Sequence, residues 1–174
     1  MSDARRRSKR LSYLLRHAPE TAELRRDAAG WVDVGELLAA LRLTREQLDH
    51  VVATNDKQRF AYDDSGRRIR AVQGHSIPVQ LGYVPARPPD LLFHGTPERS
   101  LQQVLQQGLL PRGRHAVHLS ADALTARAVG ARRGRPVVLH VDAAGMAAAG
   151  FVFTRSTNGV WLVDRVPPEF LSSR

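Results

Sequence analysis

Apolar residues recur with a helical period in the first third of the chain. Leu11, Leu14, Leu15 and Ala18 fall on one face of a helix, so residues 8–18 are predicted to form a helix that Pro19 closes. A second apolar helical pattern covers residues 35–43, and a capping box over residues 44–47 opens a third helix that runs through Val52. The first third is therefore predicted to be mainly helical.

Extended segments accompany these helices. Residues 31–34 form a short extended piece, and residues 59–62 and 67–72 alternate in polarity on either side of a turn over residues 63–66. The turn ends in Gly66, which is typical of a β-hairpin. Three short helices followed by a hairpin are the outline of a winged helix, a fold that often binds nucleic acid.

The pattern changes after a proline-rich stretch. Pro78, Pro85, Pro88 and Pro89 mark residues 76–90 as the boundary between two parts of the chain. Beyond it, short apolar strands alternate with helices, and Thr96 and Ser120 are expected to cap two of the helices. The strands are predicted over residues 91–94, 116–119, 136–141, 151–154 and 160–163, and the helices around the apolar stripe Leu101, Val104 and Leu105 and over residues 121–129. An α+β class is predicted.

Composition narrows the function classes. The chain has 174 residues, a net charge of +9 and no cysteine, which excludes disulfides, thiolate metal sites and a cysteine nucleophile. A basic balance favours polyanionic partners. The sequence contains no apolar run long enough for a membrane span and no signal-peptide pattern, so a cytoplasmic protein without a membrane partner is expected. It also lacks a GxGxxG fingerprint, a Walker A loop and clustered acidic residues for metal-assisted chemistry, so any phosphate must be held by arginine.

Several polar side chains are candidates for such chemistry. Arg16 and His17 lie off the apolar face of the first helix, where a permanent cation beside a titratable ring suits a phosphate; a solvated helix end is the alternative. Arg70 lies in the hairpin, and the segment after it crowds three hydrogen-bonding residues around a glycine. Those three residues are Gln73, His75 and Ser76. Two strand ends also carry histidine with small polar residues, namely His94, Gly95 and Thr96, and His118, Leu119 and Ser120.

These segments, taken together, resemble the RNA 2′-phosphotransferase family of the KptA type. The matching residues cover nearly the whole chain: 14–17 with Pro19, Trp31, 57–60, 69–76, 93–96, 115–120, 129–132, 158–162 and 166–170. Two positions depart from the family pattern. Phe93 replaces the usual tyrosine, and Val152 stands where an aromatic residue is common.

The resemblance implies a winged-helix RNA-binding lobe over residues 1–80, a linker over 81–90 and an ADP-ribosyltransferase-like, NAD-binding lobe of mixed α/β structure over 91–174. It implies that the RNA 2′-phosphate attacks C1″ of NAD⁺ and expels nicotinamide. The ribose O2″ then attacks phosphorus, which frees RNA with a 2′-hydroxyl and leaves ADP-ribose 1″,2″-cyclic phosphate. NAD is a co-substrate in this scheme, no metal takes part, and a monomer is expected.

The family's catalytic set maps onto Arg16, His17, Arg70 and Arg132. The first three are expected to hold the 2′-phosphate, with His17 also available as a general acid, and Arg132 to stabilise the phosphoryl charge of the second step. Gln73, His75 and Ser76 are expected to contact the RNA. The expected NAD pocket is lined by His94, Gly95, Thr96, His118, Leu119, Ser120 and Val160.

Two other functions compete with this one. A non-catalytic winged-helix regulator would bind nucleic acid without needing His94, His118 or Arg132. An ADP-ribosyltransferase acting on a terminal nucleic-acid phosphate could use the same phosphate site. Protein-modifying relatives commonly carry a late glutamate, and residues 158–161 contain none.

Overall fold

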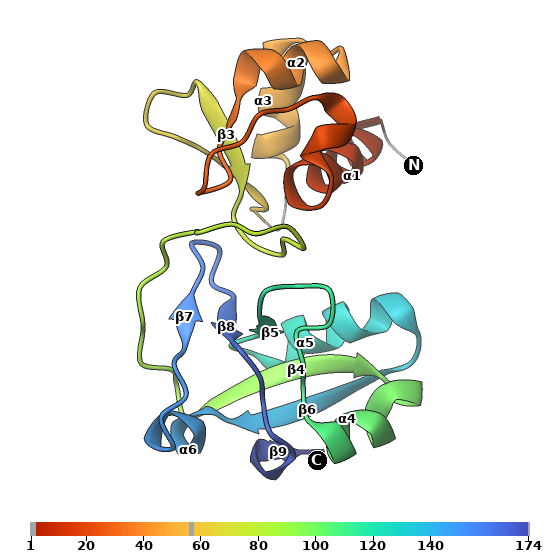
Figure 1. Ribbon diagram of the computed structural model, residues 1–174. Helices are drawn as coiled ribbons and strands as arrows, with labels where there is room; N and C mark the ends of the chain where they lie inside the picture. Colours follow the sequence, from red (N-terminus) through yellow and green to blue (C-terminus); the bar gives the residue numbers. More distant parts are fainter. Residues whose placement is uncertain (1–2, 56–57, 174) are drawn as a thin grey trace. The chain divides into compact units, whose positions relative to one another are not determined.

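The computed structural model describes residues 3–55 and 58–173, which divide into two compact units, Met1–Gly82 and Tyr83–Arg174 (Figure 1). Both units combine helices with small antiparallel sheets, so the chain is α+β, as predicted. Each unit has its own core of buried aliphatic and aromatic side chains.

The first unit packs three helices beside a three-stranded sheet. Its sheet has the order β1-β3-β2, with both pairings antiparallel. The elements are α1 (Asp3–Arg16), the 3-10 helix η1 (Pro19–Ala22), β1 (Val32–Asp33), α2 (Val34–Leu41), α3 (Arg45–Ala53), β2 (Phe60–Tyr62) and β3 (Arg68–Ala71).

The predicted apolar stripe is confirmed on α1, where Leu11, Leu14 and Leu15 are buried. The helix ends at Arg16, two residues earlier than predicted, and Ala18 is buried just after it. The helix itself extends further towards the N-terminus than residue 8, since the charged residues before it are good helix formers even without an apolar face. The capping box is also confirmed: the Gln47 backbone N–H donates to Thr44 Oγ1 at 3.3 Å, and the Thr44 N–H donates to Gln47 Oε1 at 3.1 Å.

The predicted hairpin is confirmed as well. Ala61 pairs with Arg70 in its ladder, and Gly66 closes the turn with φ +67° and an N–H that donates to the Asp63 carbonyl. Arg68 Nε donates to the Asp63 carboxylate at 2.9 Å and holds the pKa of that group at about 2. These bonds fix the position of Arg70 at the centre of the sheet.

The second unit contains two three-stranded sheets, with the orders β4-β6-β9 and β5-β8-β7. Phe93 and Ser120 join them through two backbone hydrogen bonds of 2.8 and 2.9 Å. The elements are β4 (Leu91–Pro97), η2 (Glu98–Ser100), α4 (Leu101–Gln107), β5 (Val117–Leu119), α5 (Ala123–Gly130), η3 (Ala131–Arg133), β6 (Pro136–Asp142), α6 (Ala143–Ala148), β7 (Thr154–Arg155), β8 (Trp161–Val163), η4 (Pro168–Phe170) and β9 (Leu171–Ser172).

The two predicted helix caps in this unit are wrong. Thr96 lies inside β4, buried and paired with Val137, because the β4–β6 ladder runs on to Pro97. Ser120 is occupied by its bridge to Phe93, and Asp122 caps α5 instead by accepting from the Thr125 N–H at 2.7 Å.

Some boundaries also differ from the sequence prediction. The strand predicted over 151–154 is confined to Thr154–Arg155, and α6 and β9 were not predicted from the apolar pattern. Both of these elements are short, and the six residues of α6 are mostly alanine, so neither shows a clear periodic pattern of apolar and polar residues.

Two glycines set the packing of α5 on β4. A Cβ on Gly95 would lie 1.7 Å from the Ala126 carbonyl oxygen, and one on Gly130 would lie 3.0 Å from the Gly95 carbonyl carbon. The close backbone approach that the sequence allows at Gly95 is therefore made by α5. This contact also places η3, and with it Arg132, beside β4.

Replacement of Gly95 by alanine should destabilise the protein strongly, because the new Cβ overlaps backbone atoms that cannot rotate away. We expect a loss of about 3 kcal/mol or more in the free energy of unfolding, seen as a lower thermal unfolding temperature. Gly113→Ala is the control, since nothing lies within 4 Å of its Cβ position. Equal unfolding temperatures for the two variants would show that the α5–β4 contact is not constrained.

Candidate functional site

The C-terminal end of α1 is bonded to the segment that follows the hairpin. The Ser76 backbone N–H donates to the Arg16 carbonyl oxygen at 3.0 Å, and the Ser76 hydroxyl lies 2.8 Å from His17 Nδ1. One residue thus binds both the backbone and the side chain at the end of the helix. We call this pair of bonds the Ser76 clasp.

The Arg16 side chain turns back along this segment. Its Nε and Nη2 atoms are buried, and its guanidinium carbon lies 3.6 Å from the position that a Cβ on Gly74 would take. Gly74 has φ +85°, a conformation that other residues rarely adopt, so the chain turns around the guanidinium here. His17, by contrast, is exposed. Arg16 is therefore not a solvated helix terminus.

Arg70 lies on β3 over an aromatic ring. Its guanidinium carbon is 4.4 Å from the centre of the Trp31 ring, and its Nη1 donates to the Ala29 carbonyl at 3.3 Å. The Nε atom is buried without a hydrogen-bond partner among the described residues. A buried donor of this kind is costly unless something accepts from it, and an anion is the acceptor that suits it best.

His75 approaches the same loop as Arg70. Its ring is 2% exposed, and its Nε2 lies 3.7 Å from the Cβ position of Gly30. Gly30 is flanked by Ala29 and Trp31, the two contacts of Arg70. Gln73 is half-buried beside Gly74. The first unit therefore arranges its predicted site residues around two short backbone stretches, residues 29–31 and 73–76.

In the second unit, His94 on β4 and His118 on β5 have the same arrangement. His94 Nδ1 lies 3.1 Å from the His118 carbonyl oxygen, and His118 Nδ1 lies 3.0 Å from the Ala116 carbonyl oxygen. A carbonyl only accepts, so each Nδ1 carries a hydrogen and donates it. The Nε2 atom of a neutral ring in this tautomer is an acceptor.

Burial lowers the pKa of His94, and the positive charge of Arg114 lowers it further, whereas its bond to the His118 carbonyl opposes them. His94 is thus neutral at pH 7. Sequence reasoning missed Arg114, an exposed residue whose positive charge acts on His94. The charge of Arg133 acts on Arg114 in turn.

The remaining candidates of this unit lie around the junction of its sheets. Gly95 and Thr96 lie under α5, and Ser120 joins β5 to β4. The Leu119 side chain is part of the buried core. Val160 precedes β8 in a turn in which its N–H donates to Ser156 Oγ and its carbonyl accepts from the Ser156 N–H. Arg132 is exposed on η3.

Phe93, where the sequence departs from the family pattern, contacts His140 edge to face, with ring centres 5.2 Å apart. Val152, the other departure, is exposed. Lys57, in one of the matching segments, lies outside the described residues.

Across the described ranges, no three His, Asp, Glu or Cys side chains are grouped so that they could hold a metal ion. The same ranges contain no helix with the length and apolar character needed to cross a bilayer.

Comparison with known proteins gives a consistent result. The family model for RNA 2′-phosphotransferase, Tpt1 / KptA family, matches residues 2–165. A probable RNA 2′-phosphotransferase of Burkholderia lata is 57% identical, over 97% of this chain and 90% of the relative. Proteins of the same description from Streptomyces coelicolor and Nostoc punctiforme are 55% and 49% identical, over 94% and 98% of this chain and 92% and 98% of their own lengths.

His94 should make stability depend on pH. Its pKa in the folded state lies below the value of about 6.5 for a free imidazole, so near pH 6 the unfolded chain binds more protons. Stability should therefore fall as the pH decreases below about 6.5.

The measurement is the thermal unfolding temperature between about pH 8 and pH 5.5, for the wild type and for His94→Gln. The Gln variant should lose less stability on acidification than the wild type does. The exposed residue His50 provides the control, His50→Gln, which should follow the wild type. A wild-type pH profile for His94→Gln would mean that the ring is not held neutral.

Proposed function

Because the chain belongs to the RNA 2′-phosphotransferase, Tpt1 / KptA family, we propose that it removes an internal 2′-phosphate from RNA by transferring it to the ADP-ribose part of NAD⁺. The observation that carries the proposal is the buried Nε donor of Arg70, which has no hydrogen-bond partner within residues 3–55 and 58–173, in a unit that also fixes Arg16 and His17. A phosphate is the ligand that such a set of donors would hold.

The RNA-binding part of the proposal concerns the first unit. The element order α1, β1, α2, α3, β2, β3 and the sheet order β1-β3-β2 support a winged helix, with the β2–β3 hairpin as its wing. A 2′-phosphate would accept from Arg16 and Arg70, whose planar guanidinium groups can each donate two hydrogen bonds. His17 would add a donor that is also able to protonate the departing RNA oxygen. Gln73 and Ser76 would contact the flanking nucleotide, whereas the buried residue His75, which the sequence also suggested as an RNA contact, would support this segment from beneath.

Positioning is the main task in the first step. The attacking phosphate is already an anion and nicotinamide leaves as a neutral molecule, so little acid–base help is needed. The contacts of Arg16 with Gly74 and of Arg70 with Trp31 hold both guanidinium groups before the substrate arrives. A rigid site loses less entropy on binding than one that must be ordered by its ligand.

The residues of the second unit fit NAD⁺, and we propose an ADP-ribosyltransferase-like fold for it. NAD⁺, when bound, supplies the electrophilic ribose carbon. His94 is neutral and presents Nε2 as an acceptor, which suits a ribose hydroxyl. His118, in the same tautomer, would bind a second hydroxyl. The backbone around Gly95, Thr96, Leu119 and Ser120 and the side chain of Val160 would complete the pocket, while Arg114 and Arg133 offer positive charge for a pyrophosphate.

Arg132 is assigned mainly to the second step. Negative charge then builds on the phosphoryl oxygens, and one aimed donor is typically worth about 3–4 kcal/mol of transition-state stabilisation. Its exposed position on η3, directly after the α5–β4 contact, leaves its guanidinium accessible to a ligand.

We propose further that the reaction needs no metal and that the protein is a cytoplasmic monomer. Residues 81–90 would be the linker between an RNA-binding lobe over residues 1–80 and an NAD-binding lobe over residues 91–174.

The activity is tested by incubating the protein with NAD⁺ and an oligoribonucleotide that carries one internal 2′-phosphate. We expect RNA with a 2′-hydroxyl and one nicotinamide per phosphate removed, measured by chromatography. RNA with a terminal phosphate is the comparison substrate. Modification of the terminal phosphate alone would favour the ADP-ribosyltransferase alternative, and RNA binding without nicotinamide release would favour a non-catalytic winged-helix protein.

Arg132→Ala should separate the two steps. Because Arg132 acts mainly after nicotinamide has left, this variant should release nicotinamide in excess over RNA with a 2′-hydroxyl, whereas the wild type forms them in equal amounts. Arg135→Ala is the control, because Arg135 lies in the same loop and pairs with Glu98 at 3.7 Å. If Arg132→Ala releases no nicotinamide at all, the division of roles is wrong.

A further inference from the structure

The N-terminal half of α1 carries positive charge that the proposed chemistry does not use. Arg5, Arg6, Arg7, Lys9 and Arg10 all lie within its first eight residues. The positive end of the helix dipole disfavours cations in the first turn, so helix stability does not explain this placement. The surface that these side chains form therefore has to account for their presence.

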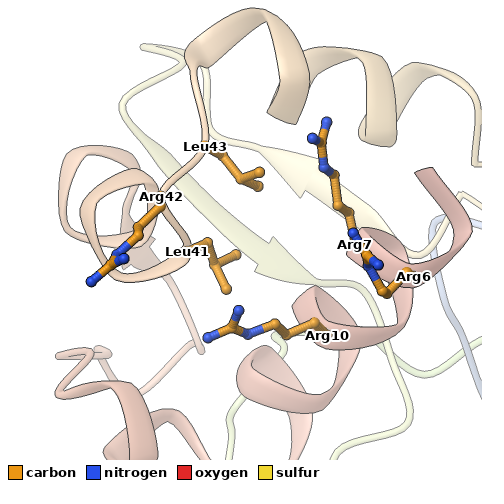
Figure 2. Close-up of a pocket in the computed structure, with 6 residues that line it drawn as sticks. All are labelled: Arg6, Arg7, Arg10, Leu41, Arg42 and Leu43. Carbon is orange, nitrogen blue, oxygen red and sulfur yellow. The ribbon is translucent and has the colours of Figure 1, made fainter. Parts of the chain in front are cut away.

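Three of them line a pocket of about 260 Å³ between α1 and the end of α2 (Figure 2). Arg6, Arg7 and Arg10 come from α1, and Leu41, Arg42 and Leu43 come from the end of α2. The leucines supply apolar surface and the arginines supply charge. Arg42 has φ +52°, in a helix-ending position where glycine is usual. The pocket therefore combines four cations with an apolar wall.

An exposed stripe leads from this pocket to the phosphate-binding residues. Arg6, Arg10, Tyr13 and His17 follow one another at separations of four, three and four residues, which places them within about 60° of one another around the helix. All four are exposed, Tyr13 by 53%, and the Tyr13 and His17 rings are 6.1 Å apart. The stripe extends for about 16 Å along the helix. Its order is cation, cation, aromatic ring, phosphate ligand.

We propose that a single-stranded RNA segment lies along this stripe, with its 2′-phosphate at His17, a base against Tyr13 and a neighbouring phosphodiester in the pocket of Arg6, Arg10 and Arg42. Arginines spaced along a surface suit consecutive phosphates, and an exposed aromatic ring among them suits a base. RNA carries both groups in the order in which the stripe presents their ligands. The inference rests on the proposed function, since it extends the site for the same substrate.

Full-length protein with the double substitution Arg6→Gln/Arg10→Gln tests the charged part. Without NAD⁺, its affinity for an RNA of about eight nucleotides with one internal 2′-phosphate should fall about tenfold. The slope of log affinity against log salt concentration should become shallower by about 0.7, from the one phosphodiester that is no longer neutralised in the pocket. Arg5→Gln/Lys9→Gln removes the same charge from positions of α1 that lie about 110° and 70° around the helix from the centre of the stripe, and should change the slope far less. Equal changes in the two double variants would overturn the proposal.

Tyr13→Ala tests the stacking part. It should weaken binding of the same RNA about tenfold, and Tyr13→Phe should recover most of that affinity, because the ring and not the hydroxyl is used. A similar loss in both variants would contradict stacking.

Substrate length separates this inference from the activity on which it rests. For wild-type protein, KM for the longer RNA should lie below KM for a 2′-phosphorylated dinucleotide, and Arg6→Gln/Arg10→Gln should remove most of that advantage. If KM for the longer RNA stays equally far below KM for the dinucleotide in this variant, the proposed RNA path along the stripe is wrong, while the proposed activity is unaffected. Failure of the proposed function appears differently, as no nicotinamide release by the wild type from either RNA.

Discussion

The Ser76 clasp is the contact on which the proposed phosphate site depends. Its two hydrogen bonds tie a segment that follows the wing to the last turn of α1, although 59 residues separate His17 from Ser76. The clasp brings Gly74 against Arg16 and His75 against Gly30, next to the contacts of Arg70. The Ser76 hydroxyl thus holds the His17 ring, and the Ser76 N–H holds the backbone of Arg16.

A different constraint acts in the second unit. Here two glycines allow the backbones of α5 and β4 to touch. Because η3 directly follows α5, this contact also places Arg132 beside β4. The histidines are fixed by backbone carbonyls, so their tautomer is set by the strands and not by a ligand. In both units, main-chain geometry holds the candidate side chains, and this rigidity is what the proposed catalysis by positioning would require.

The helices and the hairpin of the first unit could be predicted from the sequence because their signals are local. The stripe around Leu11 and the capping box at Thr44 each depend on residues within one or two turns of helix. The caps assigned to Thr96 and Ser120 were wrong because a hydroxyl before a helix is a weak signal once a strand pairing continues through it. The ladder that occupies Thr96 involves Val137, far along the chain, and no local pattern reveals it.

The candidate site shows the same difference between local signals, which the sequence reveals, and contacts between distant residues, which it does not. Its residues could be selected from the sequence through their motifs, but their contacts could not. The burial of Arg16, the ring beneath Arg70 and the influence of Arg114 on His94 all involve residues distant in sequence. The stripe on α1 could have been predicted from the sequence, because Arg6, Arg10, Tyr13 and His17 follow a helical period. Predicting it requires a search for periodic charged and aromatic positions, and not for apolar positions alone.

The proposed phosphate site is tested most directly by the affinity of the full-length protein for an RNA with and without its 2′-phosphate, measured in the absence of NAD⁺. We expect the phosphate to strengthen binding about tenfold to a hundredfold and Arg70→Gln to abolish this gain. Arg68→Gln should retain it, since Arg68 lies on the same strand but is paired with Asp27 and Asp63. Equal affinity of the wild type for both RNAs would contradict the claim that these side chains hold the phosphate.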